Sequence, residues 1–81
     1  MDFETLEINA EYQLYNKQFD CTYNVRCLGN FGVGDKVYLT RLPSKETPET
    51  LAFKFTHNIL PNAFVCWKSM VNSICILSQI N

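Results

Sequence analysis

This 81-residue sequence contains only three glycines, three prolines and one histidine, and it has no motif typical of a catalytic or metal site. Its four cysteines are spaced Cys-x5-Cys and Cys-x8-Cys, whereas paired zinc ligands usually stand about two to four residues apart. The three glycines do not form the G-x-G-x-x-G pattern of a phosphate-binding loop. We therefore predict no catalytic residue, no bound metal and no cofactor, and we expect that the protein is not an enzyme.

The sequence also lacks long apolar runs and an excess of charge of one sign. No apolar segment approaches the roughly 20 residues of a transmembrane helix, and the first residues lack the basic and apolar segments of a secretory signal. Disulfides form in oxidising compartments, which proteins usually reach through a secretory signal. Because this sequence shows no such signal, we expect a cytoplasmic location with reduced thiols. The formal net charge of -1 provides no basic surface for phosphate contacts, so we expect neither a nucleic acid nor a membrane as the partner.

Two runs of alternating apolar and polar residues dominate the first third of the chain, and together they predict a β-hairpin. Residues 6–14 would form the first strand and residues 19–27 the second, with a short polar connection over residues 16–18. Alternation places every second side chain on one face of each strand. The predicted inner face consists of Leu6, Ile8, Ala10, Tyr12 and Leu14 in the first strand and Phe19, Cys21, Tyr23, Val25 and Cys27 in the second.

Two further strands are predicted at residues 36–42 and 50–57, with an exposed loop over residues 43–49 between them. The second of these strands would turn an aromatic face inward, formed by Leu51, Phe53, Phe55 and His57. The remaining pattern has two interpretations. Strand propensity favours two strands at residues 64–68 and 73–79, whereas helical spacing of apolar residues favours a C-terminal helix over residues 62–79 and hence an α+β fold.

Five or six short strands with short connections predict one all-β domain over residues 1–81, built as a small antiparallel barrel or rolled sheet of SH3-like or OB-like architecture. All three glycines lie between Gly29 and Gly34, where we expect a long bulged turn. The adjoining sequence Gly34-Asp35-Lys36-Val37 resembles the Gly-Asp-x-Val strand opening of SH3-like barrels such as Tudor and KOW modules. This resemblance spans residues 31–39 and implies an architecture, without a family assignment.

The absence of catalytic chemistry favours a small binding module that makes protein–protein contacts as an inhibitor, an adaptor or an assembly subunit. Exposed aromatic side chains, loops or a strand edge would form the contact surface. A β domain of this small size can also protect apolar surface by pairing with a second copy, so a homodimer is expected. The candidate binding residues are Phe31, Tyr38, Tyr15 and Trp67, together with Glu7 and Glu11 of an acidic outer stripe.

The leading alternative is an OB-like or SH3-like module that binds single-stranded nucleic acid or a nucleotide by stacking bases on aromatic rings. It requires basic residues gathered on one face, and the candidates are Lys36, Arg41, Lys54 and Lys68. A second alternative is a small hydrolase or redox enzyme in which a cysteine lies within hydrogen-bond reach of His57. In the structural interpretation of these residues, His57 is a partly buried side chain and the cysteines are small buried thiols.

Overall fold

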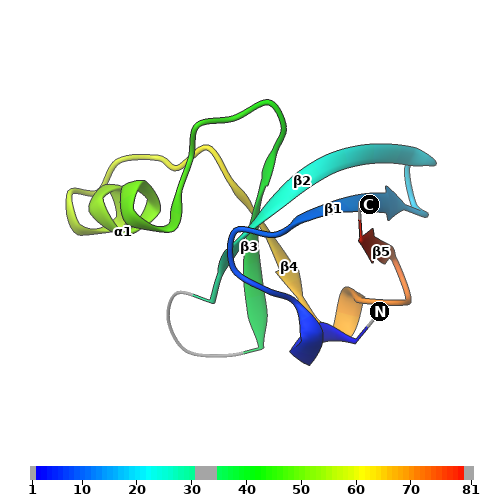
Figure 1. The fold of residues 1–81 in the computed structure, drawn as a ribbon. Helices are drawn as coiled ribbons and strands as arrows, with labels where there is room; N and C mark the ends of the chain where they lie inside the picture. Colours follow the sequence, from blue (N-terminus) through cyan, green and yellow to red (C-terminus); the bar gives the residue numbers. More distant parts are fainter. Residues whose placement is uncertain (1, 31–34, 80–81) are drawn as a thin grey trace.

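The computed structural model describes residues 2–30 and 35–79, in which five strands form one antiparallel sheet with the order β4-β3-β2-β1-β5 (Figure 1). The sheet curls into a half-barrel, so the predicted small antiparallel β architecture is confirmed. β4 and β5 are its two outer strands. The elements are η1 (Phe3–Thr5), β1 (Glu11–Asn16), β2 (Cys21–Gly29), β3 (Lys36–Arg41), α1 (Pro48–Thr56), β4 (Phe64–Trp67), η2 (Lys68–Met70) and β5 (Cys75–Gln79).

β1 and β2 form the predicted hairpin, with Leu14 opposite Tyr23 in the antiparallel register. Both strands begin and end later along the chain than predicted. Asn9 adopts a left-handed φ of 70°, which interrupts the extended backbone, and β1 starts only after residue 10. Ile8 therefore lies outside the strand and is 60% exposed, and Phe19 is exposed in the turn over residues 17–20. The prediction that these two side chains face inward was wrong.

The main core lies on the inner face of the half-barrel, and every strand contributes to it. Alternation in the strands decides which side chains are buried there. Three of the four free cysteines are buried in this core, as the structural interpretation of these residues predicts, and the fourth, Cys21, is half-buried. The core residues are Tyr12, Leu14, Val25, Cys27, Val37, Leu39, Cys66, Cys75 and Leu77.

Residues 50–57 do not form the predicted strand, because a helix starts at Pro48. The Thr47 side chain accepts a hydrogen bond from the Thr50 N–H at 3.1 Å, and the Thr50 hydroxyl accepts one from the Thr47 N–H at 2.8 Å. This reciprocal capping box satisfies two backbone donors at the helix start, and proline is favoured at the first helical position. These start signals override the alternating pattern that suggested a strand.

α1 packs on the outer face of the sheet and forms a second, smaller core there. Leu51 of α1, Leu28 of β2 and Thr40 of β3 are fully buried, and none belongs to the inner-face core. In a strand, Leu51 and Phe53 would lie on the same face, whereas in a helix side chains two positions apart point in different directions. Phe53 is consequently 56% exposed and Phe55 37% exposed, so the predicted inward aromatic face does not exist.

The C-terminal segment forms two strands, β4 and β5, and not the alternative helix over residues 62–79. The short helix η2 connects them. β2 contains a bulge between Cys27 and Gly29, where Gly29 has a φ of 102°. Residues 31–34 of the predicted bulged turn lie outside the described residues. Across the described ranges, no helix has the length and apolar character needed to cross a membrane.

Candidate functional site

Four side chains form a continuous row across β4, β3 and α1 on the outer face of the sheet. Trp67 lies opposite Lys36 in the register of β3 and β4. The Nζ atom of Lys36 lies 5.3 Å from the centroid of the Trp67 ring and 5.8 Å from that of the Tyr38 ring. The Phe55 ring meets the Tyr38 ring edge-on, with centroids 5.2 Å apart. We call Trp67, Lys36, Tyr38 and Phe55 the aromatic row.

The aromatic row remains accessible to solvent. Trp67 is 46% exposed, Phe55 is partly exposed, and Lys36 and Tyr38 are half-buried. Lys36 takes part in neither of the two ion pairs found in the part of the chain that the structure describes. The attraction between an ammonium group and ring faces holds the lysine between the two rings. The row therefore combines exposed aromatic area with a cation that pairs with no carboxylate of the described residues.

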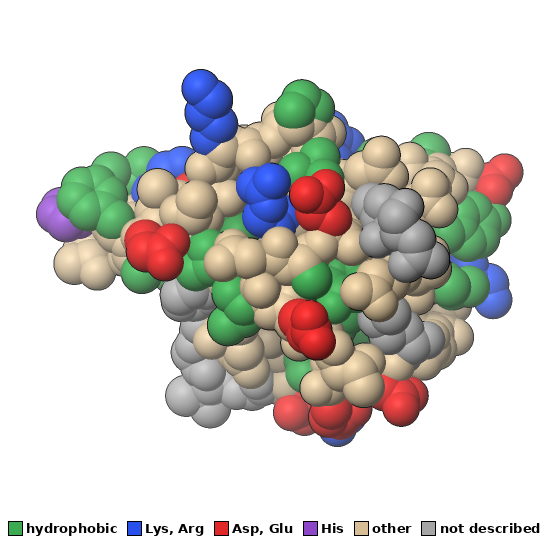
Figure 2. Space-filling model, in the orientation of Figure 1, with side chains coloured by type: hydrophobic (Ala, Val, Ile, Leu, Met, Phe, Trp, Pro, Cys, Tyr) green, Lys and Arg blue, Asp and Glu red, His purple; other side chains and the backbone are tan. Residues whose placement is uncertain are grey.

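A second apolar region lies at the projecting end of α1, where green side chains cover the surface in Figure 2. The Phe53 and His57 rings stack with centroids 4.0 Å apart, and Leu60 beyond the helix is 90% exposed. His57 is exposed, which corrects the prediction of a partly buried side chain. Its Nδ1 atom lies 2.9 Å from the Phe53 carbonyl oxygen. No contact joins His57 to a cysteine within residues 2–30 and 35–79.

The two candidate glutamates are exposed but do not form one acidic stripe on a strand. Glu11 is the first residue of β1 and stands opposite Arg26 of β2, so a basic side chain adjoins it on the same face. Glu7 lies in the turn before β1. Their arrangement gives a mixed surface, which provides weaker support for an acidic docking face than an unbroken stripe would.

Tyr15 and Phe31 do not belong to the aromatic row. The Tyr15 hydroxyl donates a hydrogen bond to Oδ1 of Asp20 at 2.7 Å, and this bond raises the pKa of the tyrosine above its usual 10.0. The contact fixes the turn between β1 and β2. Phe31 lies outside the described residues. Of the six predicted binding residues, the structure thus brings together Tyr38 and Trp67.

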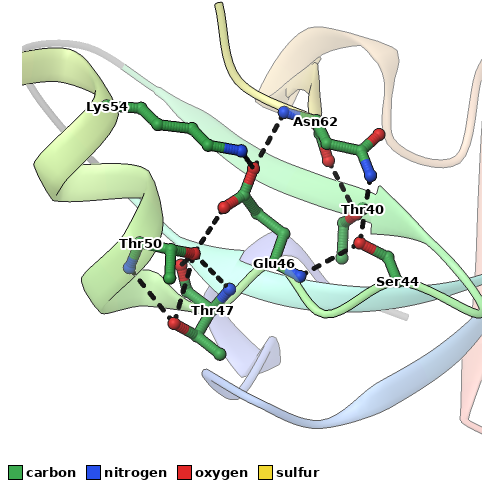
Figure 3. Close-up of polar contacts among 7 residues, drawn as sticks. All are labelled: Thr40, Ser44, Glu46, Thr47, Thr50, Lys54 and Asn62. Atoms are coloured by element: carbon green, nitrogen blue, oxygen red, sulfur yellow. Dashed lines mark hydrogen bonds and ion pairs between the residues drawn. The ribbon is translucent and has the colours of Figure 1, made fainter. Parts of the chain in front are cut away.

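A buried polar cluster holds α1 in place beside β3 (Figure 3). The Glu46 carboxylate accepts hydrogen bonds at 2.8 Å from both Lys54 Nζ and the Asn62 N–H, and it also accepts one from the Thr50 hydroxyl. The Thr40 hydroxyl donates to the Asn62 carbonyl at 2.7 Å. The cluster therefore connects the loop before α1, the helix itself, the loop after it and β3.

The protein itself satisfies this buried carboxylate. Burial raises the pKa of Glu46. Hydrogen bonds from Lys54, Thr50 and Asn62, together with the lysine charge, lower the pKa by more than burial raises it, so it lies below the usual 4.5. No buried side-chain nitrogen or oxygen in the described ranges lacks a hydrogen-bond partner. A fully paired carboxylate serves structure better than catalysis. We assign the cluster the role of positioning α1, and with it Phe55 against Tyr38.

The four basic residues required for nucleic-acid binding do not gather on one face. Lys54 is paired with Glu46, and Lys68 with Glu4. Arg41 lies over the Tyr23 ring, with its guanidinium carbon 5.0 Å from the ring centroid. In the view of Figure 2, blue side chains are separated by acidic and apolar surface. Only Lys36 lies between two accessible rings.

Sequence reasoning missed two members of the aromatic row. Phe55 was assigned to an inner strand face, and Lys36 was considered only as a phosphate ligand. The Thr47-Pro48 start signal would have placed Phe55 one helical turn after Leu51, on the side of α1 that faces the sheet. No protein family model, curated protein or solved structure matches this chain.

Proposed function

We propose that this chain is a non-enzymatic protein-binding module and that the aromatic row is its contact surface. The observation that carries the proposal is the unbroken series of contacts from Trp67 through Lys36 and Tyr38 to Phe55, with the rings left partly exposed. Tryptophan and tyrosine supply a large share of binding energy at protein interfaces. An inhibitor, an adaptor and an assembly subunit would each use such a surface.

The position of the row at the edge of the sheet supports this proposal. β4 is an outer strand, and no strand in the described part of the chain pairs with its free side. An extended segment of a partner can pair with such an edge through main-chain hydrogen bonds. Its side chains would then lie beside Trp67, because directly opposite side chains on neighbouring strands are about 4.5–5.5 Å apart.

Lys36 gives the proposed surface a charge preference. The row contains no acidic side chain, and the ammonium group of Lys36 lies between two ring faces. A partner carboxylate that reaches Lys36 would pair with a cation already held in position. Such rim charges favour correct partners and faster association more than they add affinity. We therefore expect a partner segment that is apolar and carries at least one acidic residue.

The proposal is tested by affinity purification with the intact chain and two variants. Trp67→Ala removes the most exposed ring of the row, and we expect at least about a tenfold loss of the captured partner, as hot-spot residues show. Ile76→Ala is the matched control, because Ile76 is also an exposed apolar residue of an outer strand but belongs to β5. Equal loss with both variants, or retention by Trp67→Ala, would contradict the assignment of the surface.

One observation favours the nucleic-acid alternative, namely the placement of Lys36 between the Tyr38 and Trp67 rings. Base stacking on two rings with a nearby cation is typical of single-strand binding. The test is fluorescence anisotropy with a labelled oligothymidylate at low and high salt. Saturable binding that falls with salt and is lost in both Trp67→Ala and Lys36→Gln would replace the protein-binding proposal.

A further inference from the structure

The inner face of the half-barrel opens to solvent near the turn that connects β1 and β2. An apolar cavity of about 240 Å³ lies at this opening. Its lining includes the buried core residues Leu14 and Cys75, and Phe64 of β4 lines it as well. β4 and β5 are outer strands that do not pair with each other, so the barrel is not closed on this side. The cavity therefore provides a path from the surface to the core.

The rim of the cavity contains one cation and one exposed ring. Arg41 ends β3 on the inner face, in register with Val25, and lies over the Tyr23 ring at 5.0 Å. Phe19 projects from the turn and is largely exposed. Two hydrogen bonds from the Gln18 and Phe19 N–H groups to the Asn16 side chain fix this turn.

Arg41 has no carboxylate partner within the described ranges, whose two ion pairs involve Lys54 and Lys68. The acidic residue of the adjoining turn, Asp20, accepts its hydrogen bond from Tyr15. Tyr15 is on the outer face of β1, since its neighbours Leu14 and Asn16 line the cavity on the inner side. The cavity thus presents an apolar interior with an unneutralised guanidinium at its entrance.

We propose that this cavity binds the C-terminal residue of a partner protein, with an apolar side chain inside and the terminal carboxylate on Arg41. The volume is below the roughly 300–1,000 Å³ of small-molecule sites, so it suits a single side chain. In an extended segment the neighbouring side chain points to the opposite face, which turns an adjacent acidic residue away from the rim. A terminal carboxylate is bonded to the same Cα as the apolar side chain. It can therefore reach Arg41 at the rim while the side chain occupies the cavity.

This site is separate from the aromatic row, although it rests on the proposed function in requiring a protein partner. Arg41 and Phe64 lie on the inner face, whereas Lys36 and Tyr38 lie on the outer face. Guanidinium and carboxylate groups form strong, bidentate hydrogen bonds. Binding at the cavity is therefore measurable with a short peptide, without knowledge of the complete partner.

The test is a titration of the ¹⁵N-labelled chain followed by NMR, with the acetylated peptide Gly-Ser-Gly-Leu bearing a free C-terminal carboxylate. We expect saturable shifts of amide signals around the cavity, and at least about a tenfold weaker affinity when the peptide is amidated. Arg41→Gln should weaken binding of the free-acid peptide by the same factor as amidation of the peptide does. The control Lys45→Gln, at an exposed loop residue, has the same charge change and should bind as the unaltered chain does.

Several outcomes would overturn this proposal. The first is the absence of saturable shifts up to about 10 mM peptide, a concentration at which even very weak binding would be detected. The second is equal binding of the amidated peptide. The third is a set of shifts confined to the aromatic row. Equal affinity for 3-methylbutanoate would assign the cavity to a small apolar acid instead of a peptide. None of these results depends on Trp67, so the partner test with Trp67→Ala decides the proposed function independently.

Discussion

The Nζ atom of Lys54 lies 2.8 Å from Oε2 of Glu46, and this ion pair joins α1 to the loop that precedes it. The carboxylate is almost fully buried and the ammonium group is partly shielded. Removal of one partner from a buried pair costs more than loss of a surface pair, because the remaining charge has no compensation. The pair therefore makes the position of α1 dependent on the ionisation of one carboxyl group.

The stability of the fold should decrease in acid as Glu46 becomes protonated. Its pKa lies below the usual 4.5 in the folded chain, so its contribution is complete above about pH 4.5 and is lost as the pH falls through the lower, folded-state value. Glu46→Gln should destabilise the chain by about 1–3 kcal/mol at pH 7. The difference in free energy of unfolding from the unaltered chain should shrink below pH 4.5, as measured by urea denaturation.

Glu7→Gln provides the control for this pH dependence. Glu7 is exposed and lies in the turn before β1, so its replacement should change stability by no more than about 0.5 kcal/mol at any pH. A Glu46→Gln variant whose deficit stayed constant from pH 7 to pH 3 would show that the carboxyl group contributes packing or neutral hydrogen bonds, and not charge.

The helical geometry of residues 48–56 predicts opposite consequences for two apolar residues of similar sequence context. Leu51 is fully buried between α1 and the sheet, and its change to Ala should cost about 2–5 kcal/mol. Phe53 is largely exposed, and Phe53→Ala should cost less than about 0.5 kcal/mol. Thermal unfolding of the two variants measures the difference. Comparable losses would indicate the strand, in which the two side chains share a face.

The sequence predicts the elements in which local pattern and tertiary environment agree. β1 has one buried and one solvated face, and β2 and β3 have the same alternation except where α1 covers Leu28 and Thr40, so alternation reports most of their structure directly. Residues 50–57 also alternate, but the capping signal of Thr47 and Pro48 precedes them and determines the helix. Alternation therefore predicted a strand where a helix forms. The helix buries only Leu51, so its sequence shows little apolar repeat at helical spacing that could have indicated it.

The candidate site is less accessible to sequence reasoning, because it depends on which strands become neighbours. Tyr38 and Trp67 were predicted as binding residues, and both belong to the aromatic row. Their contact through Lys36 follows from the register of β3 and β4, which joins residues about 30 positions apart. The cavity at Arg41 likewise requires the complete sheet order.

The four cysteines should differ sharply in reactivity toward a thiol reagent at pH 8. Burial raises the pKa of Cys27, and burial together with the nearby Cys75 raises the pKa of Cys66 to about 12. Both therefore remain protonated, and the thiolate is the reactive form. Cys21 is only half-buried and should react first. Stopped-flow thiol titration should give one fast equivalent in the native chain and four in denaturant, and Cys21→Ser should abolish the fast phase.

Self-association is the remaining expectation from the sequence, and we propose the aromatic row as its contact surface. Light scattering at micromolar concentration should give about twice the monomer mass of 9.4 kDa. Tyr38→Asp should restore the monomer, because loss of an interface ring costs about 2 kcal/mol or more, whereas a new surface ion pair with Lys36 returns at most about 1 kcal/mol. An unchanged circular dichroism spectrum of the variant would show that dissociation is not unfolding. A mass of 9.4 kDa for the unaltered chain at every concentration would exclude the dimer and assign the row to a different protein.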